Sequence, residues 1–120
     1  MAIKFGITDR RVGADTHVVS VRGEVDLFTA PEFKQRVTAP IAAGVDRVIV
    51  DLTETAFIDS SSLGVLISAH RRLKSRGGRL IVACNGEAIV KTFRITGLDG
   101  VFRLVDSVDA ALGDHAEAAS

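Results

Sequence analysis

The fold is decided near the centre of the chain, by the stretch Asp59-Ser60-Ser61-Ser62-Leu63-Gly64. The apolar run before it, residues 47–52, has the pattern of a buried strand, and residues 63–76 after it have helical spacing with a basic last turn. The three serines therefore lie where a strand gives way to a helix. Backbone N–H groups without helical partners gather at such a point, together with the positive end of the helix dipole.

Two roles are open for these serines. Asp and Ser are preferred caps of a helix start, so Asp59 and the residues after it need do no more than cap. The same position favours an anion, so a phosphoryl group on Ser60 would be tolerated by the fold and its charge could change binding. Capping and phosphorylation are compatible with each other.

The composition indicates one globular domain. The chain has 120 residues, of which 47% are hydrophobic and 25% charged, enough for one core and too few for two. We expect a single domain over residues 1–120, with a core over about residues 3–113 and a flexible C-terminal tail over residues 114–120.

Charge and hydropathy exclude several classes of protein. Fifteen basic and fifteen acidic residues cancel, so no basic excess draws the chain to nucleic acid or to an anionic membrane. Charges interrupt every apolar stretch before it reaches the length of a membrane-spanning helix, and the N-terminus lacks a secretory signal. We expect a soluble, cytoplasmic protein that binds neither membranes nor nucleic acid directly.

The sequence predicts neither a metal site nor a cofactor. Cys84 is the only cysteine, so no internal disulfide forms, and its place after an apolar run favours packing over reactivity. His17, His70 and His115 are scattered without the spacing of metal ligands.

Strands and helices are expected to alternate along most of the chain. Two short β-branched segments at the start, separated by the polar residues 8–16, predict a hairpin, and Gly23 is expected to bend the chain before the first helix. Because parallel neighbours need crossover helices, the alternation predicts an α/β fold with βα units around a mainly parallel sheet and an antiparallel hairpin at its N-terminal edge. The expected strands are 3–7, 17–22, 45–52, 79–84 and 101–105, and the expected helices start near Thr29, near Leu63, at Glu87 and after Ser107.

Several short motifs, in this order and spacing, resemble one bacterial family over nearly the whole chain. They are Gly23-Glu24-Val25-Asp26 with Thr29-Ala30, Asp51-Leu52, Phe57-Ile58-Asp59-Ser60-Ser61, Leu63-Gly64-Val65-Leu66, Gly77-Gly78, and Thr96-Gly97-Leu98 followed by Phe102. The chain thus resembles a STAS domain of the anti-sigma-factor antagonist kind, whose small members are phosphorylated on serine.

The resemblance implies a role for particular residues. The family's phosphorylated serine matches Ser60, and Asp26 and Thr29 match the loop beside it. Ser62 stands where the family commonly has glycine, which keeps Ser61 and Ser62 as alternative sites of modification. Partner contacts are expected at six positions, namely Asp26, Thr29, Asp59, Ser61, Gly64 and Ile67.

The resemblance also implies a cycle of partner exchange. The unmodified protein would bind an anti-sigma factor that is also a serine kinase, and so release a sigma factor for transcription. Phosphorylation would separate this complex, and a serine phosphatase would reset it. The protein itself would not be an enzyme.

Two features of the second helix bear on the partner surface. Gly64 costs about 1 kcal/mol relative to Ala inside a helix, which indicates close approach of the backbone to the sheet or to a partner. The helix carries more apolar residues than a narrow stripe needs, so Ile67 and His70 are candidates for its outer side.

Two other functions compete with this interpretation. A hydrolase would need a nucleophile with a nearby base, and the chain shows neither a nucleophile elbow nor a convincing Ser-His-Asp set. A ligand-sensing module for a nucleotide or anion, or a scaffold subunit, could use the same helix start without phosphorylation. The glycine-rich phosphate fingerprints are absent from the sequence.

Overall fold

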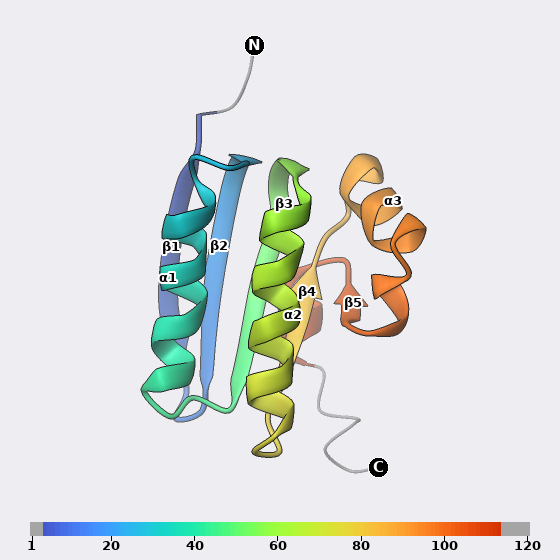
Figure 1. Cartoon of the computed structure of the whole chain (residues 1–120). Coiled ribbons are helices and arrows are strands. Elements are labelled where there is room, and N and C mark those ends of the chain that lie inside the picture. The colour runs from blue at the N-terminus through green and yellow to red at the C-terminus, as the bar shows by residue number, and fades with distance from the viewer. Residues whose placement is uncertain (1–3, 114–120) are drawn as a thin grey trace.

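The protein forms a mixed five-stranded sheet whose strand order follows the order of the chain. The computed structural model describes residues 4–113, so the expected tail at residues 114–120 lies outside the described part. The strand order is β1-β2-β3-β4-β5, with β1 antiparallel to β2 and the other neighbours parallel (Figure 1). The predicted α/β class and its antiparallel N-terminal hairpin are confirmed. The strands are β1 (Gly6–Val12), β2 (Thr16–Val25), β3 (Arg47–Ile58), β4 (Arg79–Ala83) and β5 (Arg103–Val105).

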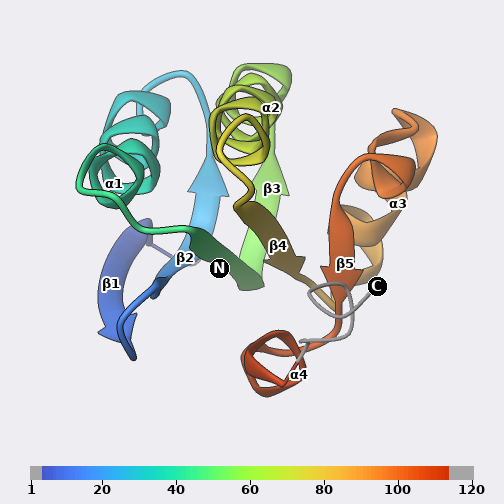
Figure 2. The same cartoon turned by 90° about the horizontal axis from the view of Figure 1, so that it is seen from below.

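The helices lie on both faces of this sheet. Figure 2 shows α1 and α2 side by side over one face, which we call the front face, and α4 against the opposite, back face. The residues of α3 that are buried belong to the front core, whereas Ala111 of α4 belongs to the back one. The helices are α1 (Ala30–Ala42), α2 (Ser60–Lys74), α3 (Glu87–Ile95), the short 3-10 helix η1 (Leu98–Gly100) and α4 (Val108–Leu112).

The first three strands differ in extent from the sequence-based expectation. β1 was expected over residues 3–7 but runs to Val12, because an edge strand with one open face carries polar residues along that face. β2 was expected to bend at Gly23 but continues to Val25, with irregular pairing to β3 that absorbs the bend. β3 extends six residues beyond Leu52, to Ile58.

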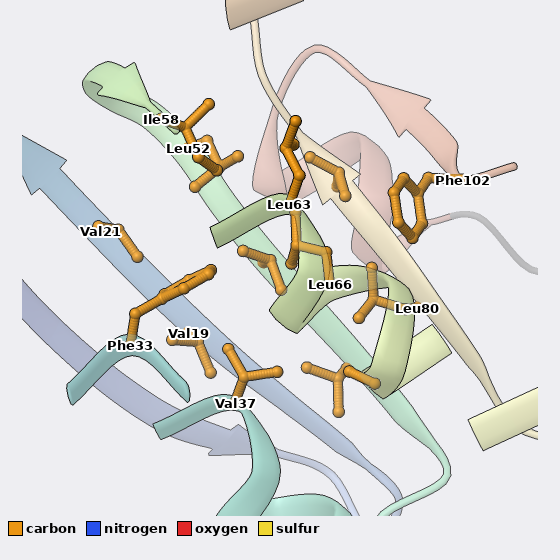
Figure 3. Packing of buried hydrophobic residues seen from close by; sticks show 14 of the residues in the cluster. Val19, Val21, Phe33, Val37, Leu52, Ile58, Leu63, Leu66, Leu80 and Phe102 are labelled. Atoms are coloured by element: carbon orange, nitrogen blue, oxygen red, sulfur yellow. The ribbon is translucent and has the colours of Figure 1, made fainter. Parts of the chain in front are cut away.

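The front core is built by side chains from α1, α2 and α3 on the sheet. Phe33 and Leu66 are fully buried, and Figure 3 shows them converging with strand residues between the helices and the sheet. Alternate strand residues face this core, as the pleat requires. The cluster includes Val19, Val21, Val37, Leu52, Ile58, Leu63, Leu80 and Phe102.

A smaller core lies on the back face. Val18, Ile49 and Ile81 are buried there beneath Ala111 of α4. Each of these strand residues alternates with residues that face the front core, so β3 and β4 are apolar on both faces at this level. This explains why both strands read as uninterrupted apolar runs in the sequence.

The turn between α2 and β4 requires glycine at one position. A Cβ atom on Gly78 would lie 2.3 Å from the carbonyl oxygen of Asp46, well inside contact distance. The same carbonyl accepts a hydrogen bond from the N–H of Arg79 at 2.8 Å. Gly78 therefore allows the chain to enter β4 in register with β3, and α2 is held at its place over the sheet.

Candidate functional site

Asp59 caps α2 through its side chain. The carboxylate oxygen Oδ1 accepts a hydrogen bond from the backbone N–H of Ser62 at 3.0 Å and a second from the Ser62 hydroxyl at 2.9 Å. The N–H of Asp59 donates to the carbonyl of Val25 at 3.2 Å, which ties the start of α2 to the end of β2. The capping role predicted for Asp59 is present in the structure, and the helix starts at Ser60 rather than near Leu63 because of this cap.

The three serines have different surroundings. Ser60 and Ser61 are exposed in the first turn of α2, whereas Ser62 is 0% exposed and its hydroxyl is engaged by Asp59. A kinase can reach a serine hydroxyl only at the surface. The extra hydroxyl at position 62 is therefore part of the capping arrangement.

The loop between β2 and α1 is fixed by Asp26 and Thr29. Oδ1 of Asp26 accepts hydrogen bonds from the N–H groups of Phe28 at 2.9 Å and Thr29 at 3.1 Å. In return, the hydroxyl of Thr29 accepts a hydrogen bond from the N–H of Asp26 at 2.9 Å. These bonds hold both side chains within the loop, so the local role of each is to set the shape of the loop.

Two large apolar side chains project from this loop into solvent. Leu27 is 70% exposed and Phe28 is 89% exposed. Neither was singled out from the sequence, because two apolar residues in a turn belong to no helical or strand period. Their position between Asp26 and Thr29, in the loop that the resemblance sets beside the serines, is the signal that could have found them.

A groove runs between α1 and α2 beside the exposed serines. It has a volume of about 510 Å³ and a largely apolar lining, to which α2 contributes Ser61 and Gly64 and α1 contributes Lys34. The loop residue Leu27 borders it, so groove and loop form one surface. We call this the serine-end surface; it comprises Ser60, Leu27 and Phe28 together with the groove residues Ala30, Pro31, Lys34, Ser61, Gly64, Val65 and Ser68.

Gly64 and Ile67, both expected to contact a partner, differ in whether they face the groove or the core. A Cβ atom on Gly64 would have no atom within 4 Å, so the expected close approach of the Gly64 backbone to the sheet is wrong, and the residue opens toward the groove. Ile67 is half-buried and packs against the front core. It lies seven residues, two helical turns, after Ser60 and so on the same flank of α2.

His70 is not on the outer side of α2 as expected. Its ring packs edge-on against Phe102, with 5.5 Å between the ring centroids, and it is half-buried. Burial, with a smaller contribution from the positive charge of Lys74, lowers the pKa of His70.

The described residues offer no arrangement for metal or thiol chemistry. Burial raises the pKa of the Cys84 thiol, which keeps it protonated. Within residues 4–113, no group of three or more His, Cys, Asp or Glu side chains could hold a metal ion. No helix in that part of the chain is long and apolar enough to cross a membrane.

The chain is similar to known proteins over most of its length. The STAS domain family model matches residues 9–111. The anti-sigma-B factor antagonist of Bacillus subtilis is 30% identical over 83 residues, which are 69% of this chain and 75% of that protein. The crystal structure of an anti-sigma factor antagonist from Mycobacterium paratuberculosis has a TM-score of 0.83 at 30% identity and covers 92% of both chains.

A third similarity concerns the fold alone. SpoIIAA, a Bacillus cell fate determinant solved in its phosphorylated form, has a TM-score of 0.70 at 22% identity, covering 88% of this chain and 96% of SpoIIAA. The motifs of the sequence resemble a STAS domain of the anti-sigma-factor antagonist kind. The match to the STAS model, the two closer relatives and the five-stranded mixed sheet agree with that resemblance. The chain belongs to the STAS domain family, among the anti-sigma-factor antagonists.

Proposed function

We propose that this protein binds an anti-sigma factor with serine kinase activity through the serine-end surface, and that phosphorylation of Ser60 releases it. A serine phosphatase would remove the phosphoryl group and restore binding. In this way the protein would regulate transcription by a sigma factor in the cytoplasm, as a binding protein and not as an enzyme. The observation that carries the proposal is the exposure of Ser60 in the first turn of α2, one residue before Ser61, which lines the groove together with the exposed loop residue Leu27.

The surface has the composition of a binding site. Phe28 and Leu27 are apolar anchors that a partner can bury, and anchors of this kind dominate the energy of many interfaces. The groove beside them supplies further apolar lining, with Ser61 and Gly64 at its wall. Asp26, Thr29 and Asp59 would act mainly by holding the loop and the helix start in position, and Ile67 would extend the contact along the flank of α2.

Phosphorylation would oppose binding through charge. A phosphoserine adds about −1.5 to −2 charges to a region that already carries Asp59 and Asp26, and an interface that excludes water tolerates such a group only where a cation meets it. Each loss of 1.4 kcal/mol weakens affinity by about tenfold, so a few kcal/mol are enough for release. The fold itself would remain intact, because the first turn of a helix favours an anion.

The likeness to relatives supports this cycle. The relatives of this chain named above are antagonists of anti-sigma factors, and the phosphorylated form of SpoIIAA shows that a protein with this fold accepts a phosphoryl group. In this chain, the burial of Ser62 favours Ser60 and Ser61 as the groups that a kinase reaches.

The test is affinity capture from an extract of the source organism, with the wild type and the Ser60→Asp variant as baits. We expect the wild type to retain a protein with an ATP-binding kinase domain and Ser60→Asp to lose it. Mass spectrometry of the wild type after incubation with that kinase and ATP should then locate the phosphoryl group at Ser60. Ser61→Ala is the matched control and should still be phosphorylated, whereas Ser60→Ala should not.

Two results would overturn the proposal. Equal capture of a kinase by both baits would show that charge at Ser60 does not control binding. If neither bait captured a kinase and a nucleotide or an inorganic anion stabilised the protein, the ligand-sensing or scaffold function would be favoured instead.

A further inference from the structure

A second concave region lies at the β5 edge of the sheet. The helices that follow the adjacent strands β4 and β5 pack there on opposite faces of the sheet. After β4 the chain passes to α3, which packs into the front core, and after β5 it passes to α4 on the back face (Figure 2). β4 and β5 are parallel neighbours, so the segments that follow them leave the same end of the sheet, one toward each face. In open α/β sheets, small ligands bind in the crevice that such a divergence leaves.

Two hydrogen bonds join the segment after β4 to the end of β5 beside this crevice. The N–H of Cys84 donates to the carbonyl of Val105 at 2.9 Å, and the side-chain amide of Asn85 donates to the carbonyl of Asp106 at 3.2 Å. The two loops that leave the sheet are therefore fixed to one another. The crevice between them has a volume of about 520 Å³, within the range of small-molecule sites.

The lining combines an apolar floor with charges of both signs. Apolar atoms come from α3, β5 and α4, and Cys84 contributes a protonated thiol. Among the described residues of the lining, Arg94 supplies a cation, and Asp99 and Asp106 supply carboxylates. None of the ion pairs found within residues 4–113 involves these three side chains. The apolar lining residues are Val90, Leu104, Val105 and Ala110.

This lining discriminates between classes of ligand. The carboxylates of Asp99 and Asp106 beside the guanidinium of Arg94 disfavour a nucleotide or another simple anion, because the described lining residues carry a net negative charge. The apolar floor in turn disfavours a small hydrated ion. A ligand with a carboxylate for Arg94, an ammonium group for the two aspartates and an apolar side group satisfies all three parts of the lining.

We propose that the crevice between α3 and α4 is a binding site for a small zwitterion with an apolar side group, of the class of the apolar α-amino acids. The site is separate from the serine-end surface, since the two share no lining residue. It does not depend on the partner cycle proposed above.

The test is a titration of the ¹⁵N-labelled full chain, followed by NMR, with three matched compounds. L-phenylalanine carries both charges, L-phenylalaninamide lacks the carboxylate, and 3-phenylpropionate lacks the ammonium group. We expect L-phenylalanine to shift the amide signals of Cys84, Asn85 and Asp106, and each analogue to bind about tenfold more weakly, because one charge-assisted contact is lost.

Two variants assign the charges. Arg94→Gln should lower the affinity for L-phenylalanine by about tenfold and leave the affinity for L-phenylalaninamide unchanged, because only the carboxylate contact is removed. Lys91→Gln is the matched control, since Lys91 is also an exposed cation of α3 but does not line this crevice, and it should change neither affinity. Both side chains are exposed, so both variants should fold as the wild type does.

The proposal would be overturned by shifts that lie outside the crevice, by no shift with any of the three compounds, or by equal affinities for all three. An unchanged affinity of Arg94→Gln for L-phenylalanine would also overturn it, because Arg94 is the cation on which the carboxylate contact depends.

Discussion

The two sides of helix α2 differ in what they do, although their residues alternate along the same fifteen positions. The core side carries Ser62, Leu66 and Leu73, all fully buried against the sheet. The open side carries Ser60, Ser61 and Gly64, which are exposed at the serine-end surface. Substitutions on the first side should therefore change stability, and substitutions on the second side should change binding, with little overlap between the two.

The largest effect is expected on the core side, at Leu66. Leu66→Ala removes a fully buried side chain from the middle of the front core and should lower the free energy of unfolding by about 3 kcal/mol. Urea unfolding measures this directly. Ser68→Ala on the open side is the control and should change stability by no more than about 0.5 kcal/mol. Similar losses in both variants would mean that the two sides are not distinct.

The next effect is expected at Phe28, next to the open side. Phe28→Ala should weaken binding of the anti-sigma factor by about 2 kcal/mol, roughly thirtyfold, because it removes an exposed aromatic anchor. Stability should be unchanged. Phe33→Ala, in the fully buried phenylalanine of α1, should do the reverse and cost stability. Calorimetry of binding and urea unfolding of both variants would show whether this exchange of effects occurs.

Substitutions at Ser62 and Ser61 compare the core side and the open side of α2 within a single helical turn. Ser62→Ala removes the hydrogen bond that the Ser62 hydroxyl donates to Asp59 and should lower stability by about 1 kcal/mol, while the rate of phosphorylation stays the same. Ser61→Ala removes an exposed hydroxyl and should leave stability unchanged. If Ser62→Ala abolished phosphorylation without loss of stability, the assignment of Ser62 to the core side would be refuted.

Gly64 should give a smaller effect of opposite sign. Gly64→Ala places a methyl group in open space and removes a helix-destabilising glycine, so stability should rise by up to about 1 kcal/mol. The methyl group would narrow the groove, and partner binding should weaken. Gly78→Ala is the informative counterpart and should lower the thermal midpoint, because its Cβ atom would meet the Asp46 carbonyl oxygen. A drop in thermal midpoint for Gly64→Ala would contradict the open-space geometry.

The smallest effect is a pH dependence from His70, at the border between the two sides. Its pKa is lowered by burial and by Lys74, so the unfolded chain binds the proton more strongly than the folded one. The stability contributed by neutral His70 is thus complete above the unfolded-state pKa of 6.5 and is lost as the pH falls from there through the lower pKa of the folded state. The urea midpoints of the wild type at about pH 8 and about pH 5 should differ more than those of His70→Gln.

The sequence predicted the elements that have a strong period or a clear stop signal. Strand β4 and helix α3 were located to within a residue, since each is a short apolar run or helical stretch bounded by glycine or asparagine. The far ends of β2 and β3 were missed. Polar residues such as Thr53, Glu54 and Thr55 interrupt the apolar pattern there, so the sequence of the strand does not differ from that of a loop.

The candidate site was predicted in part for a similar reason. Asp59 and the serines stand at a helix start, a position that local sequence defines well. The burial of Ser62 and the exposure of Phe28 depend instead on how α2 and the loop after β2 sit on the sheet. The groove beside them requires two helices that are adjacent in space, and no single segment of sequence encodes it.

The identity of strand order and chain order has a consequence for how the molecule assembles. Each new strand pairs with the strand that precedes it in the chain, so every addition extends a sheet that already exists. A chain leaving the ribosome could therefore grow its sheet by one strand at a time, without holding an early strand unpaired until a distant one is made. The hairpin of β1 and β2 would be the seed, and β5 the last strand to join.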